Sequence, residues 1–191
     1  MNLPRDYATA SAADGSGSSI PAGGYVCQIK AARPETTNSG SEMLSVMFDI
    51  FEGEYTGHYQ KQFTAAKAAG KDTRWRGTYN VFTMTKDGRT NPFFKGLITA
   101  VEKSNPNAVL VQNGVLNEGA MKNCIVGLLF REEEFLTQEG TVRTTTRPSM
   151  AVEARRIREG DYTTPAPRKL AKTAGFTELP PMPGADDDLP F

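Results

Sequence analysis

Metal ligands and catalytic motifs are scarce in this chain of 191 residues. It holds one histidine and two cysteines. Cys27 and Cys124 lie far apart between apolar neighbours, and His58 has no cysteine near it. We therefore expect buried, reduced thiols and no metal or other cofactor. No G-x-x-x-x-G-K-[ST], G-x-G-x-x-G or H-E-x-x-H pattern occurs, so nothing predicts a phosphate-binding loop, a dinucleotide site or a zinc protease.

The sequence also gives only a poor signal for a nucleophile or an acid–base pair. His58 has no evident orienting partner, and lone histidines seldom catalyse without one. The run Glu132-Glu133-Glu134 is expected in a strand, where neighbouring side chains point to opposite faces, and therefore predicts a solvated edge. We expect a protein that is not an enzyme and has no catalytic residue.

Long apolar runs are absent too. No stretch approaches the length of a membrane span, and the N-terminus has no basic segment followed by an apolar run. These absences predict a cytoplasmic protein with no membrane partner.

Net charge is zero, with 22 basic and 22 acidic residues, but its distribution is uneven. Residues 176–191 contain Glu178 and three consecutive aspartates and no lysine or arginine, so the rest of the chain has four more basic than acidic residues. A modestly basic body with a separate acidic end is the pattern expected of a protein that meets an anionic partner.

Composition divides the chain into four parts. Residues 1–19 are small and polar, and six of the 12 prolines lie from Pro165 onward. We predict a disordered N-terminal segment at 1–19, one globular domain at 20–160, a Pro-rich flexible linker at 161–185 and a short acidic tip at 186–191.

Strand patterns dominate the predicted domain. Alternating apolar residues predict strands at 25–31, 44–50 and 59–63, which together resemble a β-meander. Residues 64–89 are expected to form a long excursion, with short helical or hairpin pieces as an alternative. An apolar stripe that includes Phe93 and Phe94 then predicts a helix, capped by Asn91 with Pro92 at its first position. We assign both phenylalanines to the core.

Two strand regions follow the predicted helix. One spans 124–130 and the other spans 141–147 and resumes at 150–157, with a bulge or break at Pro148. Five strands with a helix between the third and fourth predict a mainly β protein with an OB-fold, a five-stranded Greek-key barrel. An SH3-like barrel and a small sandwich are the competing folds.

Aromatic and basic residues in the excursion indicate a surface for nucleic acid. The only tryptophan, Trp75, lies between Arg74 and Arg76, and single-stranded DNA offers phosphate charges to cations and unstacked bases to aromatic rings. The alternative is that Trp75 anchors its loop on the barrel. Further candidate contacts are aromatic or basic residues elsewhere in the predicted domain: Tyr59, Lys61, Phe63, Tyr79, Phe82, Arg131, Arg143 and Arg147.

Three of these candidates share a predicted strand. Tyr59, Lys61 and Phe63 are two residues apart and would lie on one face. On the outer surface they would form a binding platform, whereas on the inner surface the two rings would be core.

The C-terminal tip is the most specific signal in the chain. It combines three carboxylates with an apolar end: Asp186, Asp187, Asp188, Leu189, Pro190 and Phe191. The preceding prolines keep it extended, and it is suited to a hydrophobic pocket with a basic rim on another protein.

This tip closely resembles the end of bacterial single-stranded DNA-binding proteins. The body instead resembles a family of bacteriophage single-stranded DNA-binding proteins with an OB-fold. That resemblance rests on residues 20–25, 39–44, 48–57 and 127–140. It implies a protein of the bacterial host's cytoplasm that coats single-stranded DNA during phage replication or recombination and recruits phage or host partners through its tip.

Two other functions compete with this interpretation. One is an adaptor whose barrel binds protein and whose tail imitates the host docking peptide. The other is a DNA-processing enzyme such as a nuclease, which would need a carboxylate cluster that the sequence lacks. The sequence leaves the oligomeric state open, with a homodimer among the alternatives.

Overall fold

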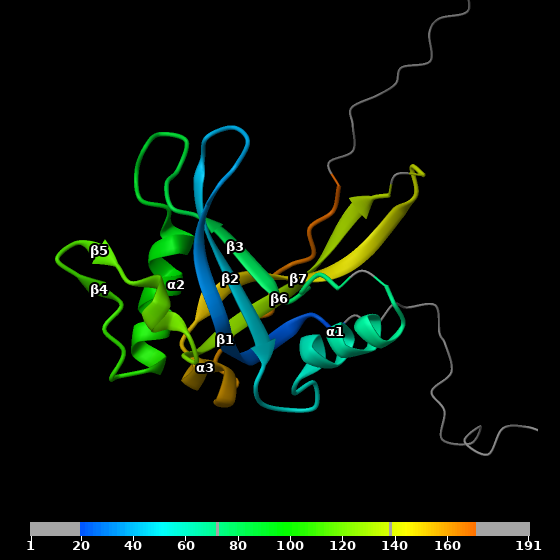
Figure 1. The fold of residues 1–191 in the computed structure, drawn as a ribbon, viewed down its shortest axis with the longest axis horizontal. Helices are drawn as coiled ribbons and strands as arrows, with labels where there is room; N and C mark the ends of the chain where they lie inside the picture. The colour runs from blue at the N-terminus through cyan, green and yellow to red at the C-terminus, as the bar shows by residue number, and fades with distance from the viewer. Residues whose placement is uncertain (1–19, 72, 138, 171–191) are drawn as a thin grey trace, which may run out of the picture.

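A five-stranded antiparallel sheet makes this a mainly β protein (Figure 1). The computed structural model describes residues 20–71, 73–137 and 139–170. The long strands are β1 (Gly23–Thr36), β2 (Glu42–Ile50), β3 (Thr78–Phe82), β6 (Ile125–Leu136) and β7 (Val142–Val152), in the spatial order β3-β2-β1-β6-β7.

The remaining elements are short, apart from two helices. They are α1 (His58–Ala68), α2 (Pro92–Ser104), the small hairpin of β4 (Val111–Gln112) and β5 (Val115–Leu116), the 3-10 helix η1 (Glu118–Met121) and α3 (Ala154–Arg158). No helix among the described residues has the length and apolar character needed to cross a membrane.

The predicted helix after Asn91 is confirmed as α2. The Asn91 side chain accepts a hydrogen bond from the Phe93 backbone N–H at 2.9 Å, and Pro92 occupies the first helical position. The predicted core role holds only in part for the two phenylalanines, because Phe94 is half-buried against the core whereas Phe93 is exposed.

The predicted third strand at 59–63 is wrong, because these residues lie in α1. Tyr59 and Phe63 are four residues apart, a spacing that places them on one helix face as readily as alternation places them on one strand face. The buried carboxylate of Asp49 fixes the helix: it accepts hydrogen bonds from the backbone N–H groups of Tyr59 and Gln60 at 2.9 and 3.1 Å.

The true third strand, β3, lies inside the stretch expected to be a long excursion. Its buried residues Tyr79 and Val81 alternate with Asn80 and Phe82. At the other end of the domain, the bulge predicted near Pro148 is confirmed, since Phe130 pairs with Pro148 and Leu129 with Met150. The strand expected at 150–157 ends at Val152, and α3 follows.

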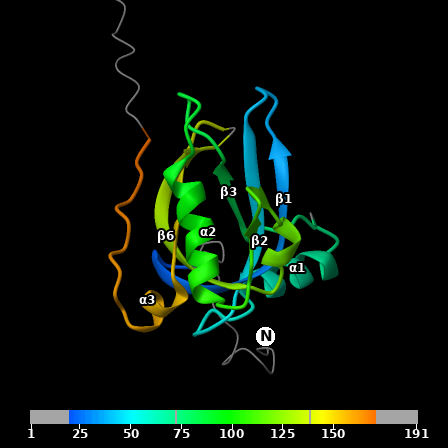
Figure 2. The same ribbon diagram turned by 90° about the vertical axis from the view of Figure 1, so that its left-hand side faces the viewer.

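The sheet does not form the closed barrel that the sequence predicted. β3 and β7 are its two edges, and they carry no shared hydrogen-bonded ladder in the described part of the chain. Helix α2 packs against both edge strands, as the two views of the ribbon show (Figure 2). The expectation of a mainly β protein is confirmed, with the sheet open.

Strand alternation gives the β1–β2–β3 part of the sheet two faces. The inner face enters the core through residues that include Leu44, Val46, Phe48, Tyr79 and Val81. Ladder partners point the same way, so the intervening residues form an outer face. This outer face consists of Arg33, Glu35, Met43, Ser45, Met47, Thr78, Asn80 and Phe82.

Both cysteines are free and buried, as the sequence predicted. Burial, together with the nearby Asp49 carboxylate, holds the pKa of the Cys27 thiol well above its usual value, so the thiol stays protonated and unreactive.

Part of the predicted linker lies against the sheet. Arg168 donates its backbone N–H to the Glu132 carbonyl at 2.8 Å and accepts from the Glu134 N–H at 2.9 Å, forming a parallel bridge to the edge of β6. The described chain therefore ends beside the β6–β7 hairpin. The predicted N-terminal segment 1–19 and the tip 186–191 lie outside the described residues.

Candidate nucleic-acid interface

The hairpin formed by β6 and β7 extends beyond the body of the sheet, and we call its residues 131–147 the arm (Figure 1). Register pairs Arg131 with Arg147, Glu133 with Thr145 and Phe135 with Arg143. Because paired residues share a face and alternate residues repeat it, these six side chains lie on one face of the arm. The structure thus brings together three predicted contacts, Arg131, Arg143 and Arg147, that are up to 16 residues apart in sequence.

Positive charge on this face is only partly neutralised. Arg131 binds Glu133 through Nε and Nη2, at 2.9 and 2.8 Å. Arg147 stands directly opposite Arg131, a juxtaposition of like charges that disfavours the ladder. Arg143 and Arg147 are exposed and form no ion pair among the described residues. An anion bound between these side chains would relieve the repulsion.

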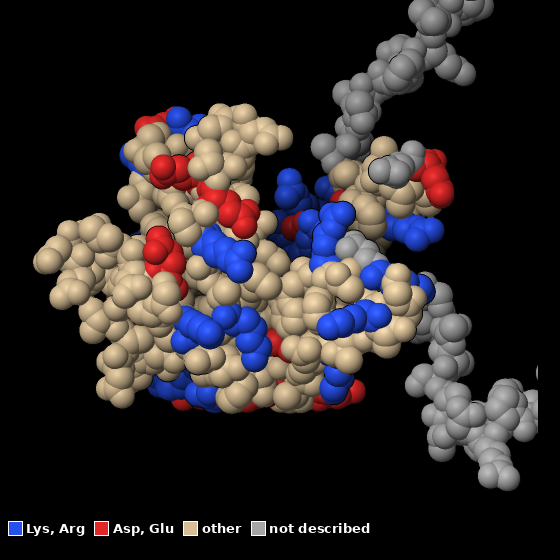
Figure 3. Space-filling model, viewed as in Figure 1, with Lys and Arg blue, Asp and Glu red and all other residues tan. Residues whose placement is uncertain are grey.

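A hollow separates the β1–β2 hairpin from the arm, and lysine and arginine side chains gather along it and over its lower rim (Figure 3). The outer face of β2 and β3 supplies half-buried Met43 and Met47 and the exposed Asn80. Phe82, a predicted contact, is 46% exposed on this same face. The face therefore offers apolar and aromatic surface with few charges.

The loop before β3 is held to the sheet by Trp75. Its indole Nε1 donates to the Phe48 carbonyl at 3.1 Å and to the Gly77 carbonyl at 3.0 Å. The ring is partly buried against the core and lies 5.9 Å from the Phe63 ring. These contacts favour the anchoring role for Trp75, while Arg74 and Arg76 on either side are exposed.

Two predicted contacts belong to the core and are corrected here. Tyr59 is 8% exposed and Tyr79 is 5% exposed, so neither ring offers a face to a base. Burial raises the pKa of Tyr79 to about 12 and that of Tyr59 further, which keeps both hydroxyls protonated. The predicted shared face with Lys61 does not exist, because in α1 the exposed Lys61 lies away from Tyr59 and Phe63.

Trp75 lends itself to a direct test. We expect Trp75→Ala to lower the free energy of unfolding by about 2–4 kcal/mol, since it removes a packed indole and the hydrogen bonds that its Nε1 donates to two carbonyls. Urea denaturation measures this loss, and Trp75→Phe, which keeps an aromatic ring, should recover part of it. A Trp75→Ala protein of unchanged stability that binds oligo(dT) about 1–3 kcal/mol more weakly would instead assign the indole to base stacking.

Several interface residues were not predicted from the sequence. They are Arg33, Met43, Met47 and Asn80, which share a face only once β2 is paired with β1 and β3. The alternation of 44–50 had already placed Met47 opposite the core. Phe135, which is 37% exposed, shares the arm face because it lies four residues after Arg131 in a strand.

The remaining arginines near the end of the domain are engaged elsewhere. On α3, Arg155 pairs with Glu153 and Glu159, and Arg156 pairs with Asp161. Arg158 binds Glu52 at 2.7 Å, which lowers the pKa of the Glu52 carboxyl.

Within the described residues, no three histidine, cysteine, aspartate or glutamate side chains gather in a way that could hold a metal ion. No protein-family model matches the chain, and no curated protein matches it.

Proposed function

We propose that this protein binds single-stranded DNA without reading its sequence and without performing chemistry on it. The observation that carries the proposal is the arm face, on which Arg143 lies opposite Phe135 and Arg131 lies opposite Arg147. Two of these three arginines lack a carboxylate partner among the described residues. Cations beside exposed rings suit a flexible strand of phosphates and unstacked bases.

The outer face of β2 and β3 continues this surface toward the β1–β2 hairpin. Its exposed Phe82 and half-buried Met43 and Met47 can receive bases, while the arm holds phosphates. A duplex presents its phosphates but keeps its bases stacked, so it would use only part of the surface. Preference for single strands is the expected consequence.

We interpret the sheet as an open version of the OB-fold. Three sequential antiparallel strands are followed by helix α2, after which β6 pairs with β1, and β7 with β6. OB-folds bind oligonucleotides on strands two and three and on the hairpin loops that flank them. The corresponding parts here are β2, β3 and the β1–β2 and β6–β7 hairpins, which are the parts that form the candidate interface.

The setting we propose is phage DNA replication or recombination in the cytoplasm of a bacterial host. It rests on the resemblance of the body to bacteriophage single-stranded DNA-binding proteins and on the tip sequence, which lies outside the described residues. The last described residues, which include Arg168, run beside the arm, so the chain leaves the described domain next to the proposed DNA site.

A titration with oligo(dT) and with a blunt duplex of equal length tests the function. We expect tighter binding to the single strand, with an affinity that falls steeply with salt because each neutralised phosphate releases about 0.7 counterion. Equal affinity for duplex, or affinity that is insensitive to salt, would contradict the proposal.

Removal of the tip should separate DNA binding from partner recruitment. In a chain ending at Ala185, we expect equal or higher affinity for oligo(dT), most visibly at low salt, because the three aspartates no longer compete with phosphate. Capture of phage or host replication proteins should be lost, and Phe191→Ala alone should reproduce that loss. Weaker DNA binding with every partner retained would refute both roles of the tip.

A further inference from the structure

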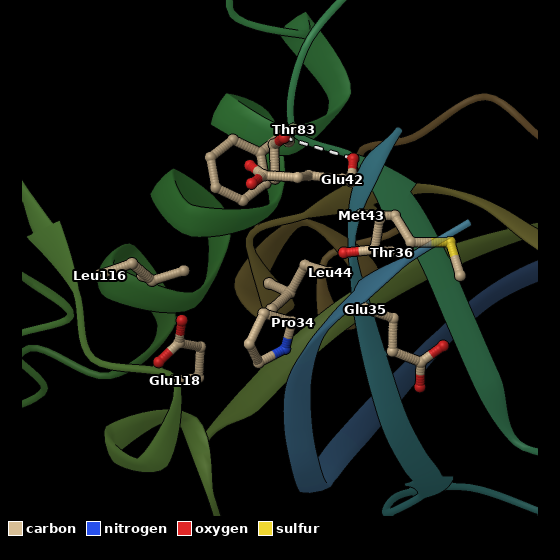
Figure 4. Close-up of a pocket in the computed structure, with 10 residues that line it drawn as sticks. Pro34, Glu35, Thr36, Glu42, Met43, Leu44, Thr83, Leu116 and Glu118 are labelled. Atoms are coloured by element: carbon tan, nitrogen blue, oxygen red, sulfur yellow. Dashed lines mark hydrogen bonds between the residues drawn. The ribbon is translucent and has the colours of Figure 1, made fainter. Parts of the chain in front are cut away.

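An apolar pocket of about 380 Å³ lies on the other side of the β1–β2 hairpin from the proposed DNA surface (Figure 4). Its apolar walls are Pro34 from β1, Leu44 from β2, Phe94 from α2 and Leu116 from β5. Val111 pairs with Leu116 in the small hairpin and so shares its face, and it is 45% exposed. Apolar surface therefore continues from the pocket onto β4.

Two carboxylates lie at the edge of this apolar pocket. Figure 4 shows the side chain of Glu42 reaching across toward α2 and that of Glu118 rising beside Leu116, while Glu35 points away. Neither Glu42 nor Glu118 has an ion pair among the described residues. Anionic groups would be repelled here, so nucleic acid and an acidic peptide are poor occupants.

An arginine or lysine side chain matches both properties of the pocket. Its aliphatic stem can pack on Pro34, Leu44 and Leu116 while its charged end meets the two carboxylates. Apolar neighbours in the same peptide could then cover Val111. We propose that this pocket docks a segment of a partner protein in which an arginine or lysine lies between apolar residues, independently of any DNA binding.

The test uses assigned amide NMR spectra of the full chain and the peptide acetyl-Leu-Arg-Leu-amide. Matched probes replace arginine with neutral citrulline or with glutamate. We expect the arginine peptide to shift the resonances of Glu42, Leu116 and Glu118 and to bind at least about tenfold more tightly than the citrulline peptide. The glutamate peptide should leave these resonances in place.

Variants of the pocket test whether its two carboxylates cause the preference for the arginine peptide. Glu42→Gln with Glu118→Gln should erase the preference for arginine over citrulline, whereas Glu132→Gln, an exposed carboxylate on the arm, should keep it. Glu42→Lys with Glu118→Lys should reverse it in favour of the glutamate peptide. Equal binding of arginine and citrulline peptides, shifts confined to other surfaces, or butylguanidinium binding as tightly as the peptide would overturn the proposal.

Discussion

Replacing Arg143 and Arg147 together by alanine is expected to weaken binding of oligo(dT) by at least about tenfold at moderate salt. Both side chains are exposed on the arm face and have no ion-pair partner among the described residues, so their charge is available to phosphate. Loss of two phosphate contacts should also reduce the slope of log affinity against log salt by about 1.4. Fluorescence anisotropy across a salt series measures both quantities.

The matched control is the pair Arg155→Ala and Arg156→Ala on α3. It removes the same two charges, but from side chains already paired with Glu153, Glu159 and Asp161. We expect this control to bind oligo(dT) nearly as the original chain does. An equal loss in both double variants would show that only net charge matters, and the arm would not be the binding site. Stability should not fall in the arm variant, because Arg147→Ala also removes the repulsion with Arg131.

Gly77→Ala is expected to destabilise the fold by about 3 kcal/mol or more. A β-carbon at this position would collide with the Phe48 carbonyl oxygen and lie 2.7 Å from the Tyr59 ring. The collision involves backbone on one side and a buried ring on the other, so neither can withdraw cheaply. The Gly77 carbonyl also accepts hydrogen bonds from Phe48 N–H and from Trp75 Nε1, so a shift of this backbone would disturb β2, β3 and the tryptophan together.

Gly96→Ala provides the control for Gly77→Ala. Gly96 lies inside α2, and a β-carbon there would meet nothing within 4 Å. Alanine should raise stability by about 0.5–1 kcal/mol, since it favours the helix more than glycine does. Chemical denaturation of both variants measures the contrast. A Gly77→Ala protein as stable as the Gly96→Ala protein would mean that residues 74–77 are not packed against Phe48 and Tyr59 as described.

Local sequence patterns correctly predicted the elements whose structure depends mainly on neighbouring residues. Asn91 and Pro92 mark the start of α2 because capping and a proline at the first turn act within a few residues. The alternation of Leu44, Val46, Phe48 and Ile50 likewise identifies β2 and its buried face.

Sequence patterns did not predict the correct secondary structure where the same residues fit both the strand and the helix periodicity. Tyr59 and Phe63 satisfy both a strand and a helix pattern, and only the buried Asp49 carboxylate, ten residues before Tyr59, favours the helix through its bonds to two backbone N–H groups. β3 was missed because five residues are too few to stand out beside Trp75 and the neighbouring cations.

The sequence by itself determined that this chain is mainly β, that a helix begins at Pro92 and that both thiols are buried. The aromatic and basic residues named as contacts for nucleic acid stay a prediction. Only the tertiary structure decided which of those residues can act together. Arg131, Arg143 and Arg147 share a face because antiparallel pairing sets Arg131 opposite Arg147 and Phe135 opposite Arg143. Tyr59 and Tyr79 are buried in the core, and Trp75 donates hydrogen bonds to two backbone carbonyls. Strand register and burial depend on contacts between residues that are far apart in the sequence. A local sequence pattern does not specify those contacts.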